Sequence, residues 1–275
     1  MKVTFCGTAS SEITPPRAAT SILVQQGDDA LLLDCGPGSL FRILETGISL
    51  RQIRAALISH LHMDHVQGFP ELLAQMVFPN GVIPEVQGPP GTAEYVRRAA
   101  HLTQLVSRPP GTPEYDTPFD VPVAEVGDGD ERDVLGIAVR SVVVPHSPDL
   151  VALARRLEVG GRSLVFSGDV APAPEIMVPL ADGADLLVHE VYSAEGIEDW
   201  VLGMRETTAE RIRAAFARTH SDLPAVCAIA SAAGARKLVL THLNPGEKPA
   251  RLLAQAAKLF PREVVIAEDG LALEV

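Results

Sequence analysis

Three histidines and one aspartate lie within six residues of this chain, in the segment His60-Leu61-His62-Met63-Asp64-His65. Imidazole and carboxylate groups are suitable ligands for zinc, manganese or iron. Four ligands so close in sequence would strain the loop if all of them enclosed one ion, so two ions that share them are easier to accommodate. The segment therefore predicts a metal site and favours one that holds two ions.

Further residues could complete such a site, because each lies at or just after the end of a strand-like segment: His146, Asp169, Glu190 and His242. In open α/β sheets, ligands bind beyond the carboxyl ends of the strands, so separate segments could converge there. We expect His146 to complete the coordination of one ion, His242 that of the other, and Asp169 to bridge both. A water between two cations roughly 3.5–4 Å apart is a strong nucleophile at neutral pH, because each cation lowers its pKa. Such a site would hydrolyse phosphate, carboxylate or sulfate esters.

Short strands interspersed with helices must position these groups. Apolar runs predict strands at residues 3–6, 20–25, 30–34, 55–59, 139–144, 163–167, 185–188, 237–241 and 263–267. Helical patterns cover about 40–46, 92–106, 208–218, 223–233 and 249–259. Thr207 and Glu210 are spaced as a capping box for the third of these helices, and Asp222 is placed to cap the fourth. The alternation of strands and helices favours the α/β class.

The segment 70–122 differs from the rest of the chain, because it is rich in proline and glycine. It predicts long connections over one face. We expect a single domain over residues 1–275, with 70–122 as a loop and helix insertion over the active-site face. Substrate choice should lie in this segment and in the 191–207 loop. The candidate wall residues are Phe69, Met76, Phe78, Tyr115, Tyr192 and Trp200.

The composition is that of a folded protein with a real core, because 47% of the 275 residues are hydrophobic and 21% are charged. The net charge of −12 repels polyanions, and the sequence contains no run of lysine or arginine that would hold a nucleic acid. Three cysteines without a CxxC pair exclude a disulfide scaffold. The sequence shows no secretory apolar region and no stretch as long as a membrane span, so we expect a cytoplasmic protein with no membrane partner.

The stretches around these residues resemble the metallo-β-lactamase superfamily, and within it the branch of ribonuclease Z, the arylsulfatase-like proteins and the cyclic phosphodiesterases. They occur in the family's order over nearly the whole chain: Gly7-Thr8, Leu32 to Gly38, Ser59 to Gly68, Pro145-His146-Ser147, Ser167-Gly168-Asp169, Asp185 to Glu190 and Leu240-Thr241-His242. The resemblance implies a four-layered αββα sandwich, with a site for two metal ions at one edge of its two sheets.

The resemblance also implies ligands for two Zn²⁺ ions, and the same groups suit Mn²⁺ or Fe. It divides the ligands into three sets: His60, His62 and His146 for one ion; Asp64, His65 and His242 for the other; and Asp169 as the bridge. In this branch Asp64 also orients or deprotonates the attacking water.

Two more residues match positions of the ribonuclease Z branch. Its members carry a glutamate after the strand that follows the bridging aspartate, and a histidine that is not a ligand at the start of a late helix. Glu190 and His220 stand at these places. A Glu–His pair beside a metal site can hold an imidazolium ready to protonate a leaving oxygen, so the resemblance implies that both are catalytic.

The chain departs from the specialised members of this branch. The interval from His146 to Asp169 is too short for the arm with which ribonuclease Z grips tRNA, and Leu157 to Gly161 predicts a plain hairpin turn. The basic stretch that ribonuclease Z carries near its N-terminus is replaced by Pro15 to Thr20, and the cysteine-rich zinc site of the cyclic phosphodiesterases is missing. We therefore predict a dinuclear hydrolase in which a metal-bridging water cleaves a small phosphodiester or sulfate ester, and these departures disfavour tRNA as a partner.

Four alternatives stay open at this point. The same scaffold hosts lactonases and other carboxylic ester hydrolases, but these commonly lack the Glu190/His220 pair. A tRNA 3′ endonuclease of ribonuclease Z type is disfavoured by the departures above. An iron-dependent redox enzyme would be revealed by metal analysis of the purified protein. A non-catalytic module is disfavoured because it would not need an intact ligand set. Relatives of this kind are often dimers, so the resemblance also implies a homodimer.

Overall fold

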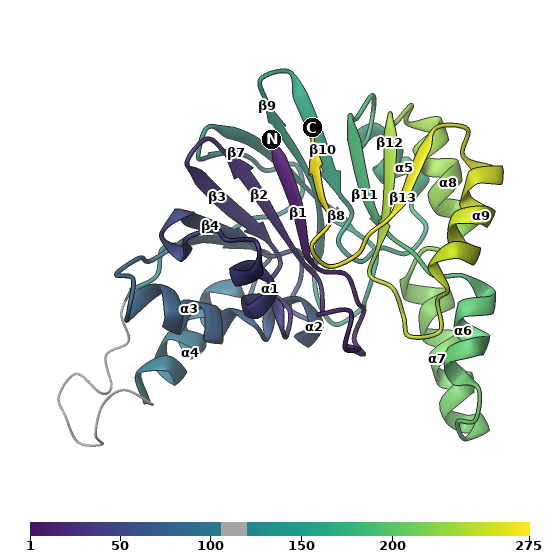
Figure 1. Ribbon diagram of the computed structural model, residues 1–275, viewed down its shortest axis with the longest axis horizontal. Helices are drawn as coiled ribbons and strands as arrows, with labels where there is room; N and C mark the ends of the chain where they lie inside the picture. The colour runs from purple at the N-terminus through teal and green to yellow at the C-terminus, as the bar shows by residue number, and fades with distance from the viewer. Residues whose placement is uncertain (106–119) are drawn as a thin grey trace.

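The computed structural model describes residues 1–105 and 120–275, which form two sheets packed face to face (Figure 1). The first sheet has the order β14-β1-β2-β3-β4-β5-β6 and the second the order β13-β12-β11-β10-β9-β8-β7. The strands of the first are β1 Lys2–Gly7, β2 Ser21–Gln26, β3 Asp29–Leu33, β4 Ile53–Leu57, β5 Glu85–Gly88, β6 Val123–Glu125 and β14 Ala272–Glu274. Those of the second are β7 Glu131–Val134, β8 Ile137–Val144, β9 Ala152–Val159, β10 Arg162–Phe166, β11 Leu186–Glu190, β12 Lys237–Thr241 and β13 Glu263–Ile266.

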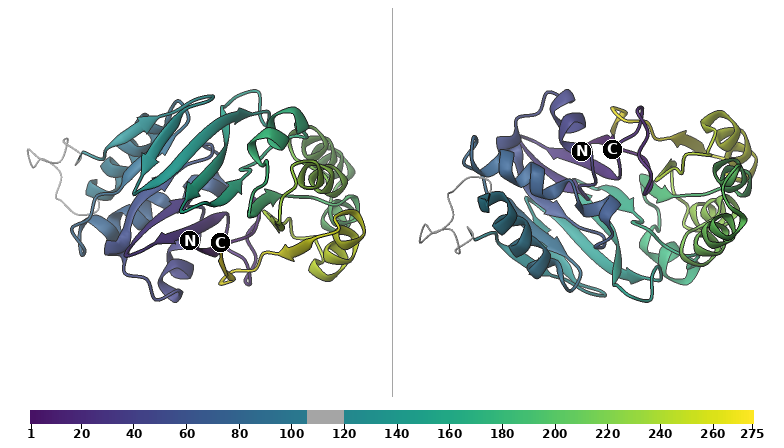
Figure 2. Two further views of the ribbon diagram at one scale, coloured as in Figure 1. Left: turned by 90° about the horizontal axis from the view of Figure 1, so that it is seen from above. Right: turned by 90° about the horizontal axis from the view of Figure 1, so that it is seen from below.

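Helices cover the outer faces of both sheets, as the views from above and below show (Figure 2). Their bounds are α1 Ser39–Glu45, α2 Met63–Val66, α3 Phe69–Val77, α4 Thr92–Leu105, α5 Pro174–Leu180, α6 Ala194–Val201, α7 Glu206–Thr219, α8 Leu223–Ala232 and α9 Pro249–Leu259, with a 3₁₀ turn at Leu50–Gln52. Residues of α1, α3 and α4 pack on the first sheet, and residues of α5, α8 and α9 pack on the second. This arrangement confirms the predicted four-layered αββα sandwich.

The central core lies between the two sheets. It includes Phe5 and Leu31 of the first sheet and Phe166 and Val188 of the second, each at most 2% exposed. Strands buried on both faces read as continuous apolar runs, which is why β3 and β10 are recognisable in the sequence.

Parallel pairing brings the ends of several strands to one edge. In the first sheet β3, β4 and β5 are parallel, and in the second β10, β11, β12 and β13 are parallel. Parallel strands end at the same edge, so the residues that follow β10, β11 and β12 lie together. This edge, near α2 in Figure 1, is where the candidate site forms.

The segment 70–122 is more regular than predicted. It contains α3, β5 and α4, and β5 is an integral strand of the first sheet; residues 106–119 lie outside the described part. The helix α3 buries Phe69, Leu72, Leu73 and Met76 on one face, a helical spacing that the proline-rich context obscures. Pro70 is compatible with a helix because it lies in the first turn, where no intrahelical donor is lost.

Two local predictions can be judged directly. The capping box at Thr207 and Glu210 is wrong, because α7 already begins at Glu206 and Thr207 lies inside its first turn. The cap at Asp222 is confirmed, because its carboxylate accepts a hydrogen bond of 2.9 Å from the backbone N–H of Ala225.

The connection between β9 and β10 is a tight hairpin, as predicted. Its turn residues Gly160 and Gly161 have φ of 58° and 74°, the left-handed conformation that this two-residue turn requires. The chain therefore passes from His146 to Asp169 through two strands and short connections, and carries no arm there. Among the described residues, no helix is both long and apolar enough to cross a membrane.

Candidate metal centre

The segment His60 to His65 forms a compact turn at the shared edge of the sheets. His60 follows β4, His62 precedes α2, and the backbone N–H of His65 donates to the carbonyl of His62 at 3.0 Å. The turn packs tightly on its neighbours: a Cβ on Gly36 would lie 2.1 Å from the carbonyl oxygen of Asp64, and one on Gly68 would lie 2.2 Å from that of Gly36. Glycine is therefore required at both places for the motif to take this shape.

A first group of candidate ligands converges from three segments: His60, His62, His146 and Asp169, whose ligand atoms all lie within 4.8 Å of one another. His62 Nδ1 lies 3.0 Å from His60 Nε2 and 3.1 Å from His146 Nε2. His60 Nε2 also lies 3.7 Å from Asp169 Oδ2. Three imidazole nitrogens that point at one another beside a carboxylate are arranged as ligands of a cation.

A second group shares Asp169 with the first: Asp64, His65, Asp169 and His242. Asp169 Oδ2 lies 3.3 Å from His65 Nε2 and 3.4 Å from His242 Nε2, and Asp64 Oδ2 lies 3.3 Å from His242 Nε2. The predicted bridge thus stands between two groups of ligand atoms.

Buried atoms in this cluster support a cation. Asp169 Oδ1 and His65 Nε2 are buried and have no hydrogen-bond partner within residues 1–105 and 120–275. Buried polar atoms without partners are rare, and a bound cation would satisfy both. Burial raises the pKa of Asp169, but the imidazoles of His242 and His65 outweigh it and hold that pKa well below its ordinary value. The residues present therefore fit divalent ions.

A carboxylate behind the cluster orients two of the imidazoles. Asp34 Oδ2 lies 2.7 Å from His65 Nδ1 and accepts a hydrogen bond of 2.7 Å from the Ser59 hydroxyl. The Ser59 oxygen in turn lies 3.0 Å from His60 Nδ1. These contacts turn the Nε2 atoms of both rings toward the cluster. This role of Asp34 and Ser59 was not predicted from the sequence, although an aspartate at the end of the apolar run 30–34 is a signal of such a site.

Replacing Asp34 with asparagine should weaken metal binding by about 10–100-fold, because the amide orients His65 less strongly than the carboxylate does. Competition with a chromogenic chelator measures the affinity. Asp185→Asn is the matched control, since Asp185 precedes β11, whereas the site lies beyond the opposite end of that strand. Equal affinities for Asp34→Asn and the unaltered protein would contradict this role.

Glu190 and His220 lie beside the second ligand group, as the resemblance implied. Glu190 Oε1 accepts a 2.7 Å hydrogen bond from the backbone N–H of Val170, and Oε2 lies 2.8 Å from His220 Nδ1. Burial and the nearby Asp169 carboxylate raise the pKa of Glu190 well above its ordinary value, and burial lowers the pKa of His220. The two groups can therefore keep one proton between them. With both oxygens of Glu190 engaged in this way, the pair is better suited to proton transfer than to ligation.

The cluster opens into a cavity of about 330 Å³. Its walls come from the loop after β1, from α2, from the turn after His146 and from α7: Ser10, Ser11, Met63, Ser147, Ala215, Phe216 and Thr219. Two of the predicted wall residues are wrong, because Phe69 and Met76 are fully buried in the core. Phe78 follows α3 and is 47% exposed, and Tyr115 lies outside the described residues. Tyr192 and Trp200 contact the wall residue Phe216.

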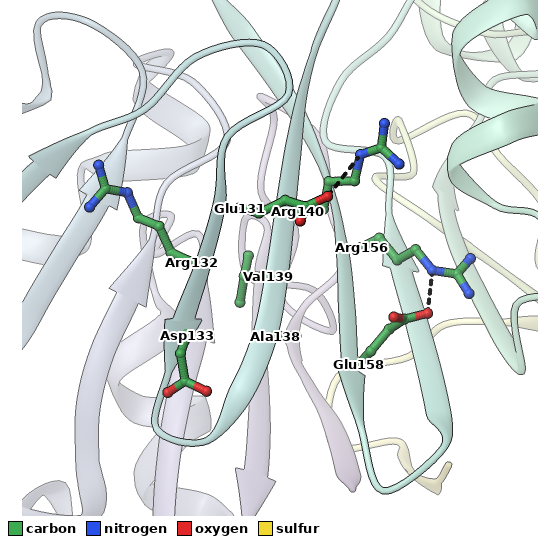
Figure 3. A pocket seen from close by; sticks show the side chains of 8 residues that line it. All are labelled: Glu131, Arg132, Asp133, Ala138, Val139, Arg140, Arg156 and Glu158. Carbon is green, nitrogen blue, oxygen red and sulfur yellow. Dashed lines mark hydrogen bonds and ion pairs between the residues drawn. The ribbon is translucent and has the colours of Figure 1, made fainter.

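A second hollow lies on the outer face of β7, β8 and β9, and Figure 3 shows the residues that line it (Figure 3). Its lining carries three acidic and three basic side chains, and four of them form ion pairs, with Arg140 at 3.8 Å from Glu131 and Arg156 at 2.7 Å from Glu158. Because these charges already neutralise each other and the lining contains no histidine, this hollow is not the candidate site.

The sandwich and the cluster at its edge define a metallo-β-lactamase-fold protein of the hydrolase type. The metallo-β-lactamase fold protein YhfI from Bacillus subtilis superposes with a TM-score of 0.77 at 22% identity, over 99% of both chains. Human tRNase Z, short form (ELAC1), superposes with a TM-score of 0.72 at 22% identity, over 100% of this chain and 99% of that chain. These likenesses show the fold.

Sequence comparison gives the family. The family described as Anti-Pycsar protein Apyc1 matches residues 1–198. A Ribonuclease Z from Mycobacterium sp. (strain KMS) is 33% identical over 283 residues, which cover 100% of this chain and 96% of the relative. The chain therefore belongs to the Apyc1 family, in the ribonuclease Z branch of the metallo-β-lactamase superfamily. The superfamily and branch predicted from the motifs are confirmed.

Proposed function

We propose that the protein hydrolyses small phosphodiesters with the help of two divalent cations, most simply two zinc ions. The observation that carries the proposal is the position of Asp169, whose carboxylate belongs to both ligand groups and lies beside the Glu190–His220 pair. A Zn²⁺-bound protein with the same fold, PqqB from Methylobacterium extorquens (TM-score 0.73, 18% identity), supports zinc as the first metal to test.

The candidate ligands would be divided between two cations. His60, His62 and His146 would hold one cation, Asp64, His65 and His242 the other, and Asp169 both. When bound, such cations lower the pKa of a coordinated water and neutralise the charge of an anionic ester. Asp64 belongs to the second ligand group and also lines the cavity, where it would orient the attacking water.

The Glu190–His220 pair would act on the leaving group. His220 Nδ1 faces Glu190, so Nε2 lies on the side of the ring away from Glu190, and since His220 lines the cavity we expect Nε2 to face a bound substrate. As the bond from phosphorus to the leaving oxygen breaks, that oxygen would take the proton of Nε2, and Nδ1 would take the proton shared with Glu190. General acid catalysis of this kind contributes roughly 10²–10⁴-fold.

Size and charge favour a small ester over a long nucleic acid. The cavity of about 330 Å³ suits a small molecule, and the net charge of −12 opposes a polyanion. Proteins that share the fold include a diphosphatase from the PhnP family (TM-score 0.72, 19% identity) and yeast PDE1 (TM-score 0.70, 12% identity), which supports phosphorus esters before sulfate or carboxylic esters.

Cleavage of a tRNA precursor is the second candidate function. The observation that favours it is the identity of 33% to a protein named Ribonuclease Z over the full chain. Two features disfavour this function: the short β9–β10 hairpin carries no arm that could hold tRNA, and the net charge of −12 repels a polyanion.

A substrate panel separates these candidates. Purified protein loaded with zinc or manganese is offered a phosphodiester, an aryl sulfate, a lactone and a tRNA precursor. We expect the phosphodiester to be cleaved at least ten times faster than the others. Faster cleavage of the sulfate, the lactone or the tRNA precursor would overturn the proposal in favour of that class.

Removal of metal should abolish turnover and lower the melting temperature. A cation present at 100 times its Kd stabilises the folded state by about 2.7 kcal/mol, which corresponds to a shift of roughly 5–10 °C for a chain of this size. Dialysis against a chelator, followed by turnover assays and thermal unfolding with and without added zinc, measures both effects. A melting temperature that metal leaves unchanged would contradict the assignment of buried ligands.

A further inference from the structure

Phe216 of α7 packs flat against the imidazole of His220. The two ring centroids are 4.5 Å apart and the planes are inclined by 23°, a stacked arrangement. The ring of His242 also stacks on His220, with the centroids 5.5 Å apart and the planes inclined by 21°. The imidazole of His220 therefore stacks with a phenylalanine and with a candidate metal ligand.

This contact supplies a constraint that the hydrogen bond to Glu190 does not. A single hydrogen bond at Nδ1 fixes one point of the ring and allows the ring to tilt about that point. The flat face of Phe216 fixes the plane of the ring, and with it the direction of Nε2. A proton donor acts only within hydrogen-bond reach of the leaving oxygen, so this direction determines how well His220 can work.

Phe216 is itself fixed by its neighbours. Tyr192 and Trp200 meet its ring edge-on, at 5.7 Å and 80° and at 5.6 Å and 84°. The indole of Trp200 donates a 2.9 Å hydrogen bond to Glu12, in the loop after β1 that also contributes the wall residues Ser10 and Ser11. Phe216 is 8% exposed and lies in the small cluster of α6 and α7, which extend beyond the sheet edge at the lower right of Figure 1.

We propose that Phe216 is a positioning residue, which holds the plane of His220 so that Nε2 faces the leaving oxygen of the substrate. This inference rests on the proposed function, because it needs a leaving group that takes a proton. In this proposal the helices α6 and α7 take part in the reaction indirectly. Phe216 of α7 orients the imidazole of His220, the proton donor, and Trp200 of α6 holds Phe216 in place.

Two substrates that differ only in the leaving group test the proposal. A nitrophenyl diester has a good leaving group that hardly needs a proton, whereas an alkyl diester has a poor one that does. Phe216→Leu keeps an apolar side chain of similar size without a flat face, and Phe216→Tyr keeps the ring. For Phe216→Leu we expect kcat to fall about 100-fold on the alkyl diester and less than about 3-fold on the nitrophenyl diester, with KM unchanged. Phe216→Tyr should stay within about 3-fold on both.

A double substitution separates positioning from general damage. In a His220→Ala background, Phe216→Leu should have almost no further effect on kcat, because the group that it positions is gone. Phe41→Ala, at a position 67% exposed on α1, is the control for the loss of a phenylalanine remote from the cavity. If Phe216→Leu unfolds, as thermal unfolding would reveal, Phe216→Met takes its place.

Equal losses on both diesters, a loss confined to KM, or an undiminished loss in the His220→Ala background would overturn the role of Phe216. Failure of the unaltered protein to cleave either diester would overturn the proposed function itself, and with it this inference.

Discussion

Replacing Asp169 with asparagine is expected to lower kcat/KM for a phosphodiester by at least about 10³-fold, equivalent to about 4 kcal/mol of transition-state stabilisation. Asparagine has nearly the same shape but lacks the negative charge. Because Asp169 belongs to both ligand groups, the loss of its charge would weaken the binding of both proposed cations at once. It also leaves the imidazoles of His65 and His242 without the carboxylate that faces them at 3.3 and 3.4 Å.

The measurement combines turnover of a nitrophenyl phosphodiester with the metal content of the purified variant. We expect the loss of activity to accompany the loss of at least one metal ion per chain. Asp185→Asn, at the opposite edge of the sheet, should retain both metal and activity. An Asp169→Asn variant that keeps full turnover would refute the shared position of this carboxylate in the site.

Replacing His220 with alanine should lower kcat by roughly 10²–10⁴-fold on a diester with a poor leaving group. The physical reason is the loss of the only group that, in the proposed reaction, gives a proton to the leaving oxygen. On a nitrophenyl diester the loss should be much smaller, because that leaving group departs as an anion. Metal content should stay unchanged, since His220 lies outside the two proposed coordination sets.

The companion variant is Glu190→Gln, which keeps the 2.8 Å contact to His220 but cannot supply its proton. It should show the same preference for good leaving groups with a smaller loss than His220→Ala. If both variants lose their metal, Glu190 and His220 are ligands, and the third group of ligand atoms, which unites them with Asp169 and His242, would be the better account.

The cluster of candidate ligands was predictable because its signals are local. His60 to His65 is a continuous motif, and each of the other candidates directly follows a strand that the apolar pattern indicates. Parallel pairing of β10, β11 and β12 then explains why residues far apart in sequence meet. Most of the strands and five helices are found close to their predicted positions for the same reason.

The surroundings of the ligands were much harder to predict, because they depend on tertiary contacts. The sequence places Asp34 at the end of an apolar strand but does not indicate that it faces His65, and it does not indicate that Phe216 stacks on His220. Phe69 and Met76 were predicted as cavity walls because they are large and close to proline and glycine, but their spacing on α3 buries them. The side chains that orient and surround the site are thus visible only in the fold.

The most direct test of the central claim is a titration of metal-free protein with zinc, in which bound metal and phosphodiester turnover are followed together. The account predicts that turnover rises with the second equivalent and reaches its plateau at two ions per chain. Full turnover with one ion per chain, or no turnover of the phosphodiester with two ions bound, would contradict it.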